Sequence, residues 1–180
     1  KEEWPLNFQI GYDVSFESSE GRRIEGGTQD LQDLALFGST EWAIGSSFLL
    51  KPAVRMAYNS RYKAPVIPSL NLKYNIKRWV FRASYARGFR APSLKELYFD
   101  FVDINHNIVG NKELNAEFSH NITSDVSFKK TFSSLQLKMD VGFFYNNMDN
   151  LITLAISPND PQQYTYVNIG EYSTIGNTIN

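Results

Sequence analysis

Apolar and polar residues alternate strictly over long stretches of this sequence. From Leu6 to Phe16, every even position is apolar and every odd position is polar or glycine. This period of two predicts a β-strand with one apolar and one polar face. Strands of soluble proteins average about 5–6 residues, whereas strands that cross a bilayer as part of a barrel need about 9–11. The alternating stretch therefore has the length of a membrane-spanning strand.

The alternation predicts about eight strands, joined by connections of two kinds. The predicted strands are residues 6–16, 34–44, 48–58, 69–76, 79–88, 117–128, 135–150 and 163–172. Short connections near 45–47, 77–78 and 131–134 alternate with long ones near 17–33, 59–68, 89–116 and 151–162. Barrels of the bacterial outer membrane have short periplasmic turns and longer outer loops. The sequence therefore predicts an all-β fold, an antiparallel meander of long membrane-type strands that is part of a larger outer-membrane β-barrel, with no helix longer than about two turns.

The pattern also predicts which side chains share a face of the sheet. We expect the side chains within each of two sets to lie on the same face of the sheet, because a register slip of one residue would move a whole set to the opposite face. The sets are Phe8, Ile10 and Tyr12, and Leu137, Met139 and Val141. Several aromatic residues lie close to predicted strand ends, where the aromatic girdle of a barrel meets the lipid headgroups: Trp42, Tyr58, Tyr62, Tyr74, Trp79 and Phe132.

Composition removes several other classes of protein. The chain has 42% hydrophobic and 14% aromatic residues, which favours strands, and its net charge of −1 leaves no basic stripe for nucleic acid. The absence of cysteine excludes disulfides and thiolate metal sites. No Gly-x-Ser-x-Gly, His-Glu-x-x-His or phosphate-loop motif is present, so we expect no enzyme. No run of about 18 apolar residues is available for a membrane-spanning helix.

The N-terminal segment lacks a charged region followed by an apolar one, so we expect an internal or processed start rather than a secretory signal. Two alternatives to a barrel segment remain open. One is a soluble β-rich binding domain with one face on its own core, which accounts for alternation but not for strand length or loop asymmetry. The other is a small autonomous barrel with a structural role.

Two short motifs flank the longest predicted loop. The first ends the preceding strand with Gly88, Phe89, Arg90, Ala91 and Pro92. The second precedes the next strand and contains Gly110, Asn111, Leu114 and Glu117. The chain resembles TonB-dependent receptors, where Gly-[Phe/Tyr]-[Arg/Lys]-Ala-Pro ends a strand and Asn-Pro-[Asp/Asn]-Leu-Lys-Pro-Glu opens the next. The first motif matches fully, whereas Lys112 and Ala116 occupy positions where the family usually has proline.

The resemblance implies transport of a scarce nutrient through the bacterial outer membrane. Residues 1–180 would then be a partial barrel, with the plug domain and the remaining strands outside this sequence. The implied partners are TonB, through the missing plug, a small-molecule nutrient and outer-membrane lipid, but no nucleic acid. No cofactor is expected. A ferric siderophore, haem or cobalamin would each suit such a receptor.

The long loop between the two motifs carries the candidate ligand-binding residues: Arg90, Tyr98, Phe99, Phe101 and His106. Aromatic and arginine side chains, Arg87 included, suit bulky or anionic ligands. The position of His106 between the two motifs resembles that in haem importers, where a neutral imidazole ligates the haem iron. The alternative is a solvated loop histidine that binds no metal, and no metal site is firmly expected. We expect His120, which follows the second motif, to be structural.

Overall fold

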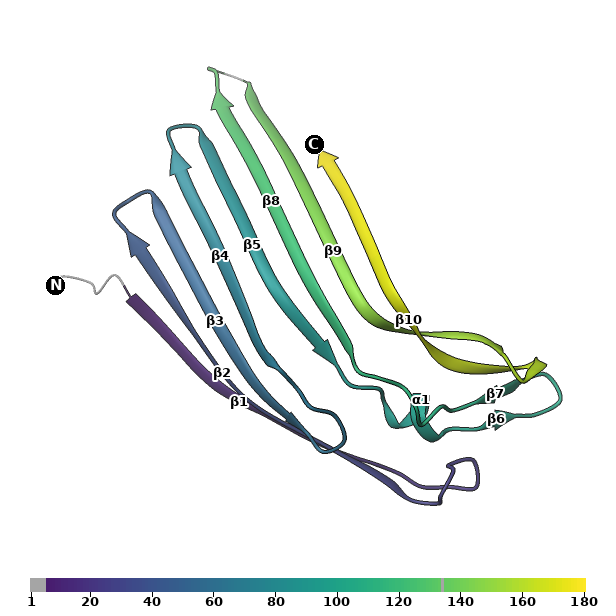
Figure 1. Ribbon diagram of the computed structural model, residues 1–180. Helices are drawn as coiled ribbons and strands as arrows, with labels where there is room; N and C mark the ends of the chain where they lie inside the picture. The colour runs from purple at the N-terminus through teal and green to yellow at the C-terminus, as the bar shows by residue number, and fades with distance from the viewer. Residues whose placement is uncertain (1–5, 134) are drawn as a thin grey trace.

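The computed structural model describes residues 6–133 and 135–180, which form one ten-stranded sheet and one short helix (Figure 1). The elements are β1 (Leu6–Ser19), β2 (Gln29–Ile44), β3 (Phe48–Asn59), β4 (Val66–Ile76), β5 (Trp79–Arg90), α1 (Leu94–Tyr98), β6 (Phe101–Val102), β7 (Asn107–Val109), β8 (Glu117–Thr131), β9 (Gln136–Ser157) and β10 (Asp160–Ile179). The sheet order is β1-β2-β3-β4-β5-β8-β9-β10-β7-β6, with only β10 and β7 parallel among the described strands. The predicted all-β antiparallel fold is confirmed.

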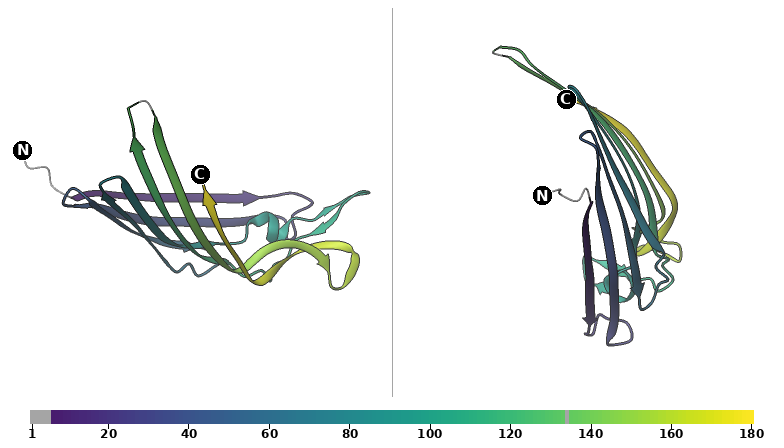
Figure 2. Two further views of the ribbon diagram at one scale, coloured as in Figure 1. Left: turned by 90° about the horizontal axis from the view of Figure 1, so that it is seen from above. Right: turned by 90° about the vertical axis from the view of Figure 1, so that its left-hand side faces the viewer.

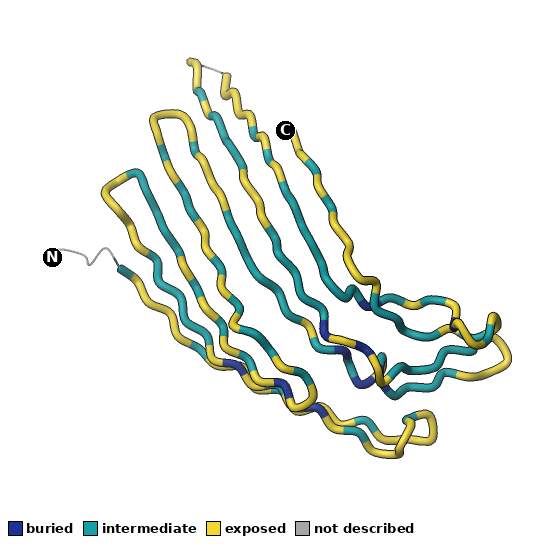
Figure 3. Tube along the Cα trace, in the orientation of Figure 1, coloured by how far each residue is buried: buried dark blue, intermediate teal, exposed yellow. Residues whose placement is uncertain are grey.

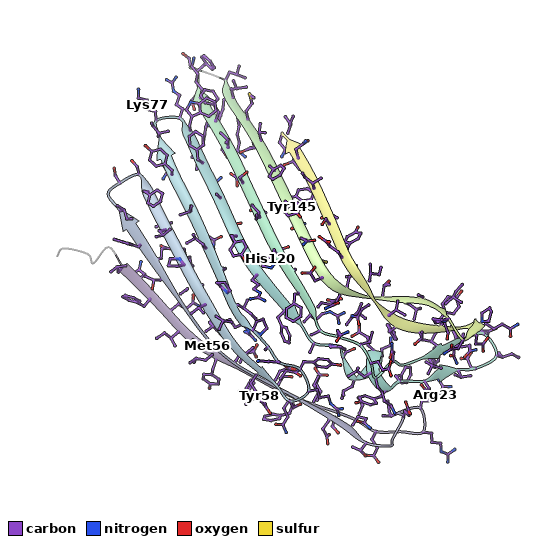
Figure 4. All side chains as sticks on the ribbon, viewed as in Figure 1. Arg23, Met56, Tyr58, Lys77, His120 and Tyr145 are labelled. Atoms are coloured by element: carbon purple, nitrogen blue, oxygen red, sulfur yellow. The ribbon has the colours of Figure 1, made fainter. Side chains whose placement is uncertain are left out.

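The strands form a single curved layer rather than a packed sandwich (Figure 2). Short turns lie at one end of this wall, where Figure 4 labels Lys77, and the long connections lie at the other, where it labels Arg23. The helix α1 has 5 residues, within the predicted limit. Among the described residues, no helix is long and apolar enough to cross a membrane.

One face of the wall is apolar across all the long strands, and we call it the apolar face. Register places Tyr12 opposite Leu36, and Leu36 opposite Met56. The same face continues through residues paired in turn across the sheet: Tyr74, Phe81, Val126 and Val141. Both predicted sets therefore share this face, and the side chain of Ile10 is 80% exposed. The predicted register is confirmed.

The opposite face, here the polar face, carries hydrogen-bonding and charged side chains. Three ion pairs lie on this face: Asp13–Arg55 at 3.0 Å, which joins β1 to β3 across β2, Arg82–Asp125 at 2.8 Å between β5 and β8, and Lys138–Asp140 at 2.7 Å within β9. A soluble sheet would bury its apolar face against a second layer, and none covers it among the described residues. An apolar outer surface around a polar interior is the arrangement of a membrane barrel.

The buried side chains gather toward the long-loop end of the wall (Figure 3). There a small hydrophobic core contains Leu97, Leu114 and Ile152, packed against three tyrosines, Tyr62, Tyr98 and Tyr166. These residues come from four separate segments of the chain. The loops are therefore folded against one another, not merely attached to the strands.

Two predicted connections were wrong in length. The long connection predicted at 151–162 is instead a continuation of β9 and β10, joined by a tight turn at Pro158 and Asn159. The regular alternation of short and long connections therefore fails at this hairpin. Asn150 has a positive φ of 57°, which marks a bend in β9. The sequence around this bend looks like the end of a strand, although pairing with β10 continues beyond it. The connection predicted at 17–33 is likewise shortened, because β2 begins at Gln29.

Candidate functional site

The long loop between β5 and β8 folds around helix α1. Ser93 caps the helix: its hydroxyl accepts from the backbone N–H of Glu96 at 3.3 Å, and its own N–H donates to the Glu96 carboxylate at 2.8 Å. This reciprocal pair satisfies donors that a helix start would otherwise leave unbonded. Leu94 and Leu97 are buried at 2% and 1% exposure, so one turn of helix anchors the loop.

Arg90 joins the two motifs through ion pairs. Its guanidinium donates to both oxygens of Glu117 at 2.6 and 2.8 Å, and to Glu96 at 2.9 Å. The Glu117 carboxylate also accepts from the backbone N–H of Ile152 at 2.6 Å, which ties in the outer part of β9. Burial raises the pKa of the Glu96 carboxyl, but hydrogen bonds from Arg90 and Ser93 outweigh it and hold that pKa below its usual value.

The second motif holds the far end of the loop. Asn111 donates its backbone N–H to the Glu96 carbonyl and its side-chain amide to the Tyr166 carbonyl, both at 2.8 Å. A Cβ on Gly110 would lie 2.7 Å from the Leu97 carbonyl carbon, so only glycine allows this approach. Where the family usually has proline, Lys112 forms a 2.6 Å ion pair with Glu25 of the β1–β2 connection.

The β1–β2 and β3–β4 connections also form hydrogen bonds with the long loop. Arg61, from the β3–β4 connection, donates to the hydroxyl of Tyr98 and to the backbone carbonyl of Asp30. The Tyr98 carbonyl accepts from the N–H of Glu25 at 2.9 Å. Tyr98 is therefore held from two sides, and its ring is packed in the loop core.

The remaining candidates are Phe99, which directly follows α1, and Phe101 and His106 of the β6–β7 hairpin. Phe99 and Phe101 stack with ring centroids 6.0 Å apart, and the His106 ring lies 4.5 Å from that of Phe101. His106 Nδ1 lies 2.9 Å from the Asp103 carboxylate, which leaves Nε2 without a hydrogen-bond partner among the described residues. Hydrogen bonds, first from the Asn105 N–H and then from His106, hold the pKa of Asp103 below its usual value.

This hairpin borders an open depression of about 500 Å³. Its lining includes His106 and Asp103 from the hairpin turn, and Leu154 and Tyr164 from the outer parts of β9 and β10. Polar and apolar walls meet in it, as in sites for small molecules. Within residues 6–133 and 135–180, no group of three or more histidine and acidic side chains is arranged to hold a metal ion.

The candidates therefore fall into separate places. Arg90 is bound to two carboxylates, whereas His106 borders the depression and Phe101 packs against the His106 ring. Arg87 lies on the apolar face, opposite His120, and is separate from these loop residues. Sequence reasoning missed Arg23, whose guanidinium lies 5.1 Å from the Phe101 ring, because a sequence does not say which connections meet.

Comparison with known proteins gives concordant matches. Residues 5–176 match the family model described as TonB dependent receptor-like, beta-barrel. An iron-regulated outer membrane virulence protein of Vibrio cholerae is 29% identical over 153 residues, which are 78% of this chain and 23% of that protein. The haem/hemopexin utilization protein C of Haemophilus influenzae is 28% identical over 130 residues, 61% of this chain and 18% of that protein.

Among solved structures, the siderophore receptor PirA from Pseudomonas aeruginosa superimposes with a TM-score of 0.80 at 20% identity. The match covers 97% of this chain and 32% of that one. At this identity the likeness concerns the fold alone. The chain thus spans under a quarter of the length of the two curated relatives and about a third of this structure.

Proposed function

This chain belongs to the family of TonB-dependent receptor β-barrels, and from that premise we propose that it is a segment of the wall of a receptor that imports chelated iron, as a siderophore complex or as haem. The observation that carries the proposal is a curved wall with an apolar and a polar face and interlocked loops at one end. Its location is the bacterial outer membrane. The chain is part of a transport protein, and no enzymatic role is proposed for it.

The remaining parts of the transporter are also proposals. The short coverage of the relatives supports further strands and a plug domain elsewhere in the whole protein. Contact with TonB, which supplies the energy for uptake, would be made through that plug. The polar face, with its ion pairs, would then line the interior in which the plug is held.

We place ligand recognition at the β6–β7 hairpin and the depression beside it. The Asp103 carboxylate orients the His106 ring through Nδ1 and leaves Nε2 outward, the arrangement that carboxylates give to metal-ligating histidines. A stacked pair, Phe99 and Phe101, lies alongside and could contact a flat macrocycle. These features favour haem, in keeping with the name of the Haemophilus influenzae relative.

A ferric siderophore is the second candidate. The Arg23 guanidinium over Phe101 offers a cation beside aromatic rings, which suits an anionic chelate. The solved structure named above as a siderophore receptor has the same fold. Neither of these features requires the imidazole of His106.

The test is the His106→Ala variant of the full-length receptor. If haem is the ligand, loss of the imidazole should abolish haem-dependent growth and the absorption spectrum of histidine-ligated haem. Asp103→Asn should weaken haem binding by about 10–100-fold, as outer-shell changes do. His120→Ala, the matched control on the apolar face, should leave haem binding unchanged.

Haem binding that survives in His106→Ala would exclude ligation by this residue. Uptake of a ferric siderophore by both wild type and His106→Ala would then support the second candidate. Failure to take up either compound would contradict the proposed function as a whole.

A further inference from the structure

An arginine and a histidine lie side by side on the apolar face of the wall. Arg87 on β5 is paired in register with His120 on β8. Both lie two positions beyond Tyr85 and Ile122, toward the long-loop end, where the aliphatic part of this face ends. Figure 4 labels His120 on the sheet surface, below Tyr145 in that view and closer to the loops. On these two strands, the pair therefore marks the border of the apolar face on the side of the long loops.

Aromatic rings pack around these two side chains. The Arg87 guanidinium lies 5.9 Å from the Phe118 ring, and Phe118 packs on Phe89 at 5.7 Å. Tyr85 stacks on His120 with ring centroids 6.0 Å apart. Arg87 and His120 are half-buried among these rings. Neighbouring side chains therefore restrict the positions of Arg87 and His120.

The hydrogen-bonding groups of this pair are incompletely used. Arg87 has no ion pair among the described residues, and its Nε is buried without a partner. His120 Nδ1 lies 2.9 Å from the Tyr85 hydroxyl. If that hydroxyl donates to Nδ1, the neutral ring carries its proton on Nε2 as a further donor. The buried Nε is closed to an outside anion, but the two terminal nitrogens of the guanidinium have no hydrogen bond among the described residues, so they and His120 Nε2 are donors available side by side.

The acidic residues of this face do not neutralise Arg87. Register places Asp149 opposite Phe118 and Glu171 opposite Asp149, one row further toward the loops and on more distant strands. An arginine that faces lipid is strongly destabilising at the middle of the bilayer and costs little near the headgroups. An anion at the headgroup level would remove that cost, since the guanidinium fork matches phosphate in a bidentate geometry.

We propose that Arg87 and His120 bind the phosphate group of a lipid in the outer leaflet that surrounds the barrel. The lipid is favoured over free phosphate because the site opens on the apolar face, where Tyr85, Phe89 and Phe118 offer surfaces for acyl chains. This site lies on the opposite surface from the proposed nutrient route. Its lipid binding therefore does not depend on which iron compound is imported.

The test measures lipid binding by native mass spectrometry of the full-length receptor in neutral detergent. The probes are lipid A with both phosphates, enzymatically dephosphorylated lipid A, and inorganic phosphate. Wild type should bind the phosphorylated lipid at least about tenfold more tightly than the dephosphorylated one, as expected for charged hydrogen bonds. Arg87→Gln should remove this preference, and Arg87→Lys should retain part of it because it keeps the charge but loses the fork.

Arg82→Gln is the matched control, because Arg82 lies on the same strand but on the polar face, paired with Asp125. It should preserve the preference for phosphorylated lipid. The folding of Arg87→Gln is checked by its heat-modifiable migration in gels. The proposal is overturned if this folded variant retains the wild-type preference for phosphorylated lipid, or if the wild type shows no such preference. Displacement of the lipid by millimolar inorganic phosphate would also overturn it, since a free-anion site would then be indicated.

Discussion

At the scale of single residues, the two motifs that mark the family meet in one cluster at the mouth of the wall. Arg90 of the first motif binds Glu117 of the second; Arg90 also donates to Glu96 of α1, and Glu117 accepts from the backbone N–H of Ile152 in β9. Pro92 and Leu114 are buried beside them. The spacing of these motifs along the chain therefore corresponds to a folded contact between the two ends of the long loop.

Gly110→Ala should disrupt this cluster locally. The added methyl group would lie 2.7 Å from the backbone of Leu97, which cannot move without displacing α1. Overpacking of this kind costs about 1–3 kcal/mol. We expect faster proteolytic cleavage within 91–116 and an intact barrel. Gly170→Ala, where a Cβ would meet nothing within 4 Å, should leave cleavage unchanged, and equal cleavage in both variants would contradict this account.

Glu96 should make the docking of α1 sensitive to acid. Because hydrogen bonds hold its pKa below the usual value in the folded loop, its contribution is complete above the ordinary glutamate pKa and is lost as pH falls through the folded pKa. Amide hydrogen exchange of residues 93–98, corrected for intrinsic rates, should therefore rise as the pH falls below about 4.5. Glu96→Gln should weaken this dependence. Glu113→Gln, exposed on the same loop, should leave it intact.

At the scale of elements, the part of the β9–β10 hairpin that extends beyond Asn150, residues 151–169, begins at one bend. We call this part the outer hairpin. Asn150 adopts φ 57° opposite Gly170, and its carbonyl accepts from Asn168, which also bonds Asn115 in the long loop. A β-branched residue rarely adopts such a backbone, whereas glycine does so readily.

Asn150→Val should therefore destabilise the outer hairpin by roughly 1–3 kcal/mol, the usual cost of a strained backbone conformation. Asn150→Gly should be tolerated. Hydrogen-exchange protection of residues 151–169 should fall in the valine variant and stay near wild type in the glycine variant. Equal protection in both would mean that the left-handed backbone conformation does not hold the bend.

The sequence predicted the wall better than the loops, for physical reasons. Alternation over β1 and β9 reports local backbone geometry, so the strands and their faces followed directly from it. The pairing of β7 with the distant β10 depends on contacts between segments far apart in sequence, which no local period records. For the same reason, the ion pairs of Arg90 became visible only in three dimensions. The face of Arg87, by contrast, follows from the alternation, because Arg87 lies two positions beyond Tyr85 on β5.

At the scale of the whole molecule, the chain taken alone has two open edges. β1 has a partner on one side only, and most of β10 has none beyond β9 among the described residues. Unpaired strand edges and a broad apolar face both promote association. We expect the isolated 180-residue chain to form oligomers or aggregates without detergent. A stable monomer by light scattering in detergent-free buffer would support the soluble-domain alternative.

In the full-length receptor, the two faces should respond oppositely to a new charge. Val54 lies on the apolar face, paired with Gly38, and Ser39 lies on the polar face, paired with Ala53. A lysine that faces lipid near the middle of the bilayer costs about 2–4 kcal/mol, whereas a lysine that faces a hydrated interior costs little. Val54→Lys should therefore lower the free energy of unfolding into denaturant, measured in lipid vesicles, by an amount in that range. Ser39→Lys should change it by less than about 1 kcal/mol. A larger loss for Ser39→Lys than for Val54→Lys would mean that the apolar face does not contact lipid, and the barrel assignment of this wall would fail with it.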